Sequence, residues 1–168
     1  MTNPQPAESI AELMRSLDGV LHVADERLVM DDEDGFRAEG VRNAVWSATF
    51  SSDTGVIEVA RWIIWEASQA LGAPSASINA LYMARGRGEV NGFTVPAVNL
   101  RTQVFDMAAA MCHAADSIEA GTIIFELARS EQEYTFQRPG EYITSVLAGC
   151  IHAGWEGPVF VQGDHYQF

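Results

Sequence analysis

Cysteines, basic residues and long apolar runs are all scarce in this sequence of 168 residues. The two cysteines, Cys112 and Cys150, cannot form a disulfide framework, and their small apolar neighbours favour buried, reduced thiols. The apolar stretches are far shorter than the roughly 20 residues that a membrane-spanning helix needs. The N-terminus lacks the basic and apolar regions of a secretory signal, so we expect a cytoplasmic protein.

The shortage of basic residues also limits the possible partners. There are 10 basic residues against 23 acidic ones, which gives a formal net charge of -13. This sign repels phosphate backbones and anionic lipids, so we expect neither a nucleic-acid nor a membrane partner. A local basic pocket for a small phosphorylated substrate remains compatible with the overall charge. Hydrophobic residues make up 48% of the chain and charged residues 20%, which is typical of a globular protein.

The N-terminal half has a mainly helical pattern. Its strongest helix is predicted over 53–72, where Asp53 or Thr54 can cap the start and Gly72 can end it. The acidic tract 31–34 reads as a solvated surface loop. Further helices are predicted over 7–19, 40–50 and 75–88, and short strands over 20–23 and 27–30.

From Gly92 onward the pattern alternates between strand and helix. The predicted strands are continuous apolar runs, which favours a parallel sheet covered by helices. Such an alternation belongs either to a (β/α) barrel or to an open doubly wound sheet. The strands are predicted over 93–100, 121–127 and 157–164, and the helices between them over 102–118 and 138–154.

Polar residues follow each of these three strands. In parallel β/α folds the working residues collect where strands end, because the parallel arrangement brings these ends to one face. A shared site is therefore plausible at this edge. The polar residues are Asn99, Arg101 and Thr102 after the first strand, Glu126, Arg129 and Ser130 after the second, and Asp164 and His165 after the third.

Asp164 and His165 form the most chemically suggestive pair. Adjacent residues of an extended segment point to opposite sides, but Gly163 permits a turn that would bring both to one site. A histidine there can give a neutral nitrogen to zinc, and the aspartate can relay a proton to a reacting oxygen. The alternative is an aspartate that caps a helix, with the histidine packed on the loop.

Three stretches of the sequence resemble a known family. "INALYMARGRGEVNGFTVPAVNLRT", "GTIIFELARSE" and "GPVFVQGDHYQF" are similar to the opening of class II, zinc-dependent ketose-bisphosphate aldolases. The first strand of that family ends in a "VPAxN"-like sequence, the second resembles "PIIxQ", and the third ends in an Asp-His pair. The resemblance covers about residues 78–168.

The resemblance implies the first three strands of a TIM (β/α) barrel over 78–168, preceded by a mainly helical extension over 1–77. It implies reversible aldol cleavage of a ketose bisphosphate, in which zinc stabilises the enediolate of dihydroxyacetone phosphate. His165 is then a zinc ligand and Asp164 the acid that protonates the aldehyde oxygen. Asn99 is a substrate-binding residue, and Arg129 and Ser130 are predicted to bind substrate as well. We expect the intact protein to be a homo-oligomer.

Departures from the family pattern leave alternatives open. A barrel needs eight strands, typically within about 250 residues, and a catalytic zinc usually takes three protein ligands. The expectation is therefore the front part of a longer lyase, inactive alone. Glu126 and the Asp-His strand also resemble the non-catalytic subunits of tagatose-bisphosphate aldolases. A complete, small open α/β binding module is the third alternative.

Overall fold

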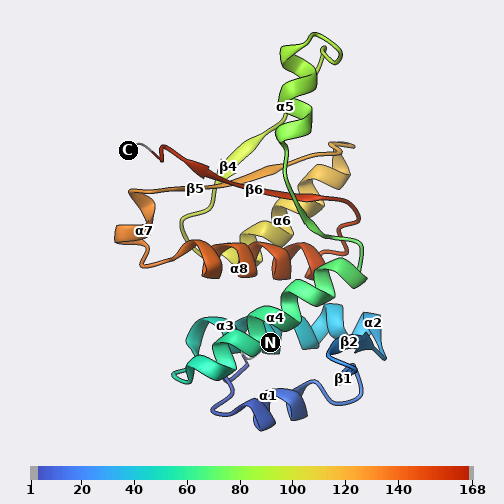
Figure 1. Ribbon diagram of the computed structural model, residues 1–168, viewed down its shortest axis with the longest axis vertical. Coiled ribbons are helices and arrows are strands. Elements are labelled where there is room, and N and C mark those ends of the chain that lie inside the picture. Colours follow the sequence, from blue (N-terminus) through green and yellow to red (C-terminus); the bar gives the residue numbers. More distant parts are fainter. Residues whose placement is uncertain (1–3, 167–168) are drawn as a thin grey trace.

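The computed structural model describes residues 4–166, which form two sheets and a set of helices (Figure 1). The smaller sheet is an antiparallel hairpin, and the larger one has four parallel strands in the order β3-β6-β5-β4. The chain is therefore a mixed α/β protein, as its sequence predicts. The strands are β1 (Leu21–Ala24), β2 (Arg27–Met30), β3 (Ser75–Ala76), β4 (Ala97–Asn99), β5 (Ile124–Ala128) and β6 (Val159–Asp164).

Most of the predicted helices are present. The helix predicted over 53–72 is α4, and the Asp53 carboxylate caps it by accepting from the Val56 N–H at 3.0 Å. Asp32, in the acidic tract, caps a single helical turn instead of lying in a plain loop. The helical elements are α1 (Ile10–Ser16), α2 (Glu33–Gly35), the π-helical η1 (Phe36–Gly40), α3 (Val41–Phe50), α4 (Thr54–Ala70), α5 (Asn79–Gly86), α6 (Val104–Ser117), α7 (Glu131–Tyr134) and α8 (Pro139–His152).

The elements are arranged in layers. Helices α6 and α8 lie against one face of the parallel sheet, and the N-terminal helices lie beneath them (Figure 1). Helix α8 contacts both α3 and α4, so it is covered on the side away from the sheet. Helix α5 projects on the opposite side of the sheet from α6 and α8 (Figure 1).

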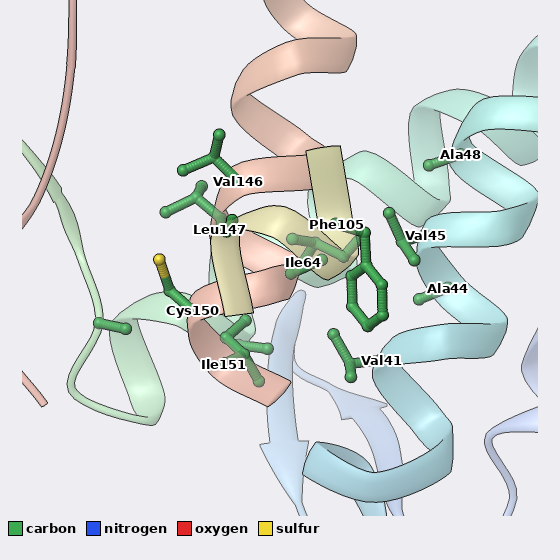
Figure 2. Close-up of a cluster of buried hydrophobic side chains, with 14 of the residues drawn as sticks. Val41, Ala44, Val45, Ala48, Ile64, Phe105, Val146, Leu147, Cys150 and Ile151 are labelled. Atoms are coloured by element: carbon green, nitrogen blue, oxygen red, sulfur yellow. The ribbon is translucent and has the colours of Figure 1, made fainter. Parts of the chain in front are cut away.

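One hydrophobic core joins the N-terminal helices to the helices that cover the sheet. Figure 2 shows side chains of α3 facing Ile64 of α4, Phe105 of α6 and the apolar side of α8. Gly149 lets α8 approach α6 closely, because a Cβ atom there would lie 2.4 Å from the Phe105 carbonyl oxygen. Arg37 adds polar contacts beside this core, since its guanidinium donates to the backbone carbonyls of Ile151 and Leu71 at 3.0 and 3.1 Å.

The other face of the sheet carries the polar strand residues. Side chains alternate along a strand, and Phe125, Leu127, Val159 and Val161 belong to the core on the helix side. Asn99, Glu126, Gln162 and Asp164 therefore lie on the face that α6 and α8 leave uncovered. The strand register aligns Asn99 with Glu126, Glu126 with Gln162, and Ala128 with Asp164.

Three further local features differ from the sequence predictions. The first strand of the parallel sheet is only three residues long, although the prediction ran over 93–100. The start of the predicted helix 75–88 is extended, and β3 pairs there with the first two residues of β6. Helix α7 lies between the second predicted strand and the helix predicted over 138–154, where no helix is predicted. The division of the chain at residue 77 stays a prediction.

Candidate functional site

Polar side chains gather at the carboxyl ends of β4, β5 and β6. These ends lie at one edge of the sheet because the three strands are parallel neighbours. We call this group the strand-end cluster. It consists of Asn99, Arg101, Glu131 and Asp164.

Asn99 and Asp164 come together, as the sequence predicts for a shared site. The Asn99 Nδ2 lies 3.5 Å from the Asp164 Oδ2, although 65 residues separate them in the chain. The same nitrogen donates to the Glu131 Oε2 at 3.1 Å. Ionised carboxylates only accept hydrogen bonds, so the amide must turn its NH₂ group toward both of them. The Asn99 carbonyl oxygen therefore points away from these two carboxylates.

Glu131 is the most deeply buried charged residue of the cluster, with 3% of its surface exposed. Its carboxylate accepts from the Arg101 Nε at 2.6 Å, and also from the Ala128 backbone N–H at 3.0 Å. Burial alone raises the pKa of this carboxyl group, but the donors from Ala128, Arg101 and Asn99 together bring the pKa below its usual value of 4.5. Glu131 is thus held in its ionised form.

A second hydrogen-bonded chain runs across the open face of the sheet. The Gln162 Nε2 donates to the Glu126 Oε1, and the Tyr82 hydroxyl donates to the Gln162 Oε1 at 3.2 Å. Tyr82 belongs to α5, which is thereby tied to the middle of β6. The middle of the sheet face and its carboxyl edge are both polar.

His165 lies beside Asp164 but points outward. Its Nε2 is 3.4 Å from the Asp164 Oδ1, and 77% of its side chain is exposed. The turn occurs at His165 itself, whose φ is 52°, and not at Gly163 as the sequence suggested. Gly163 has a different role, because a Cβ atom there would lie 2.8 Å from the Tyr166 ring.

Arg129 and Ser130, predicted to bind substrate, are exposed in the turn between β5 and α7. The Arg129 backbone N–H donates to the Asp164 carbonyl oxygen at 3.2 Å, which joins this turn to the end of β6. Ser130 precedes α7 and makes no side-chain capping bond to it. Both residues therefore lie near the strand-end cluster, on its solvent side.

The residues present do not by themselves fit the zinc ion that the resemblance implies. Asp164 and His165 offer one carboxylate and one imidazole. Over residues 4–166, no group of three or more His, Cys, Asp or Glu side chains is placed to hold a metal ion. Because a catalytic zinc usually takes three protein ligands, the set is incomplete here.

Glu131 is the member of the cluster that the sequence did not reveal. It follows the strand by three residues within a polar segment, where a carboxylate normally faces solvent. The only sequence feature that could have indicated a role for Glu131 is its position just after a buried strand, and Arg129 and Ser130 share this position. Only the packing of α7 against β5 distinguishes it from them.

Comparisons with known proteins give no assignment: no family model, no curated protein and no solved structure matches the chain. Within the part of the chain that the structure describes, no helix is long and apolar enough to cross a membrane.

Proposed function

We propose that this chain forms the first part of a class II aldolase-like (β/α) barrel, in a cytoplasmic enzyme of carbohydrate metabolism that cleaves a ketose bisphosphate. The observation that carries the proposal is the meeting of Asn99 and Asp164 at the carboxyl edge of a parallel sheet. These are the two residues that the family resemblance assigns to the substrate and to proton transfer.

The order of β4, β5 and β6 supports this proposal, whereas β3 beside β6 and α5 on the other side of the sheet are features that an open doubly wound sheet also has. Strands β4, β5 and β6 are neighbours in chain order, and the helices that follow β4 and β5 lie on the same face (Figure 1). A barrel is built in this way, with helices outside and polar strand ends inside. A doubly wound sheet reverses its strand order and places helices on both faces.

Asp164 is the proposed acid and base of the reaction. It lies on the open face with the Asn99 amide beside it, where a substrate hydroxyl or aldehyde oxygen can approach. The sequence contains no lysine. These residues therefore supply no amine for a Schiff base, the other common way to activate a ketone for aldol cleavage. In a zinc-dependent aldolase the metal takes that part, and His165 would need additional ligands from beyond this chain.

Two observations limit the barrel proposal: helix α5 lies on the side of the sheet where the lumen would be (Figure 1), and β3 occupies part of the free edge of β6. Strand β3 pairs with Val159 and Phe160 at the start of β6, on the side where a fourth barrel strand would lie. Beyond Phe160 the pairing with β3 ends. A fourth strand is therefore expected beside the later residues of β6.

The exposed imidazole of His165 favours one second candidate, a non-catalytic aldolase subunit. In such a subunit the barrel and its strand ends are kept while the metal chemistry is lost. Both candidates place Asn99 and Asp164 inside a barrel, so activity is what separates them.

The test is a coupled assay for ketose-bisphosphate cleavage with added zinc, on this chain and on the complete product of its gene. We expect the complete product to cleave the ketose bisphosphate. Asp164→Asn should lower its kcat at least about 100-fold, because proton transfer at this residue is lost. The control Asp106→Asn should keep full activity. Asp106 is exposed in the first turn of α6, beside Val45 and Trp46 of α3. Turnover by the 168-residue chain alone would refute the partial-barrel proposal. A complete product without any cleavage activity would refute the enzyme and favour the subunit.

A further inference from the structure

Glu131 is a buried carboxylate on a helix of only four residues. The helix follows β5 by two residues, and the Glu131 side chain turns back beneath the strand ends. Burying a charged group is costly unless it is paired and hydrogen-bonded. The contacts to Arg101, Ala128 and Asn99 satisfy this condition with donors from two neighbouring strand ends.

All the donors around Glu131 suit only a charged carboxylate. A backbone N–H, a guanidinium N–H and an amide NH₂ each point a hydrogen at an oxygen, and a protonated carboxyl group would place its own hydrogen against one of them. Glu131 thus acts as a fixed negative charge under the carboxyl edge of the sheet. The side chains of Arg101 and Asn99, which donate to this carboxylate, are held in place with it.

The consequence reaches Asp164 through Asn99. An asparagine side chain can rotate its amide by half a turn, which exchanges a donor for an acceptor at nearly the same position. With Glu131 at 3.1 Å from Nδ2, the flipped orientation would bring the Asn99 carbonyl oxygen against a carboxylate. Glu131 therefore selects the orientation in which Asn99 also presents a hydrogen to Asp164.

We propose that Glu131 is a positioning residue of the site: its carboxylate holds the Asn99 amide so that Nδ2 faces Asp164. Glu131 keeps a hydrogen-bond donor beside Asp164. That this donor affects catalysis rests on the proposed function. The geometric part is independent of any reaction. The competing explanation is that Glu131 merely anchors α7 to the sheet.

The first experiment measures geometry in the 168-residue chain. The side-chain amide of Asn99 is assigned in a ¹⁵N–¹H NMR spectrum and compared between wild type, Glu131→Gln and the control Glu133→Gln. Glu133 belongs to the same helix but is exposed. We expect the Asn99 amide signals to shift by more than their linewidth in Glu131→Gln and to stay in place in Glu133→Gln.

Glu131→Asp keeps the charge on a shorter side chain and serves as a second variant if Glu131→Gln does not fold. It should move the same signals, because its carboxylate no longer reaches Asn99. Unchanged Asn99 signals in the variants that fold would overturn the inference, whether or not the protein is an enzyme.

The second experiment measures turnover in the complete gene product. A residue that acts through a neighbour loses its effect when that neighbour is removed, and a double-mutant cycle measures this loss. We expect Glu131→Gln to lower kcat by about 10- to 100-fold, which is the usual loss when a residue that orients a functional side chain is replaced. In an Asn99→Ala background we expect the same substitution to lower kcat only about 2-fold.

Equal losses in both backgrounds would show that Glu131 only anchors α7, and would overturn the positioning role. A wild-type product without cleavage activity would instead refute the proposed function. The NMR comparison would then decide the geometric inference alone, so the two failures are distinguishable.

Discussion

Gly149 offers a sharp test of how the two sheet-covering helices pack. It lies within α8, where a Cβ atom would meet the Phe105 carbonyl oxygen at 2.4 Å, the Ala108 Cβ at 2.8 Å and the Ala109 nitrogen at 3.1 Å. Two of these neighbours are backbone atoms of α6, which cannot move aside as the end of a flexible side chain can. Gly149→Ala must therefore push α6 and α8 apart.

The expected magnitude follows from two opposing effects. Alanine in place of glycine within a helix favours folding by about 1 kcal/mol. Overpacking a core typically costs about 1–3 kcal/mol, and contact with rigid backbone places this site near the upper end of that range. The free energy of unfolding should thus fall by roughly 2 kcal/mol. For a chain of this size the melting temperature should fall by about 4–8 °C.

Gly140 in the same helix is the matched control. A Cβ atom there would meet only the Arg61 Nη1 at 3.6 Å, which is ordinary van der Waals contact. Gly140→Ala should leave the protein equally stable or up to about 1 kcal/mol more stable. Urea and thermal unfolding followed by circular dichroism measure both variants. A Gly149→Ala protein as stable as Gly140→Ala would refute the close packing of α6 on α8.

Three further predictions concern polar groups and thiols. Because the folded-state pKa of Glu131 is lowered, its stabilisation is complete above the usual value of 4.5 and is lost as the pH falls toward the folded-state pKa. In urea unfolding at several pH values, the stability gap between wild type and Glu131→Gln should shrink below pH 4.5, and a widening gap would contradict this. Arg37→Met removes two hydrogen bonds to carbonyl groups at helix ends and should lower the free energy of unfolding by about 2 kcal/mol in the same assay. An unchanged urea midpoint would exclude this capping role. Cys112 and Cys150 are both buried with their sulfur atoms 3.5 Å apart, and their hydrogen bond and burial raise the pKa of Cys150. Ellman's reagent should label both thiols only on unfolding, and rapid labelling of the native protein would contradict their burial.

Local signals in the sequence were sufficient for much of the fold. Helix α4 carries a capping aspartate, a long apolar periodicity and a terminal glycine, and it forms where these signals predict. The apolar runs of β5 and β6 also predicted parallel strands correctly. The proximity of Asn99 and Asp164 followed from the same reasoning, because parallel neighbours bring their carboxyl ends to one edge.

The remaining features depend on contacts between distant residues. The two-residue strand β3 exists only because β6 offers an edge for it, and nothing local marks it. Glu131 resembles any exposed glutamate in a polar segment until Asn99 and Arg101 surround it. Gly163 was interpreted as a turn residue, but the turn lies at His165, and the exposed Tyr166 ring packs close to Gly163 instead.

The crystal structure of the complete gene product tests the central claim most directly, namely that the face carrying Asn99 and Asp164 is the inside of a barrel. We predict a further parallel strand beside β6 beyond Phe160, with the Asp164 carboxylate facing an enclosed lumen. Further helices packed over that face in addition to α5, with no strand added beside β6, would contradict the account.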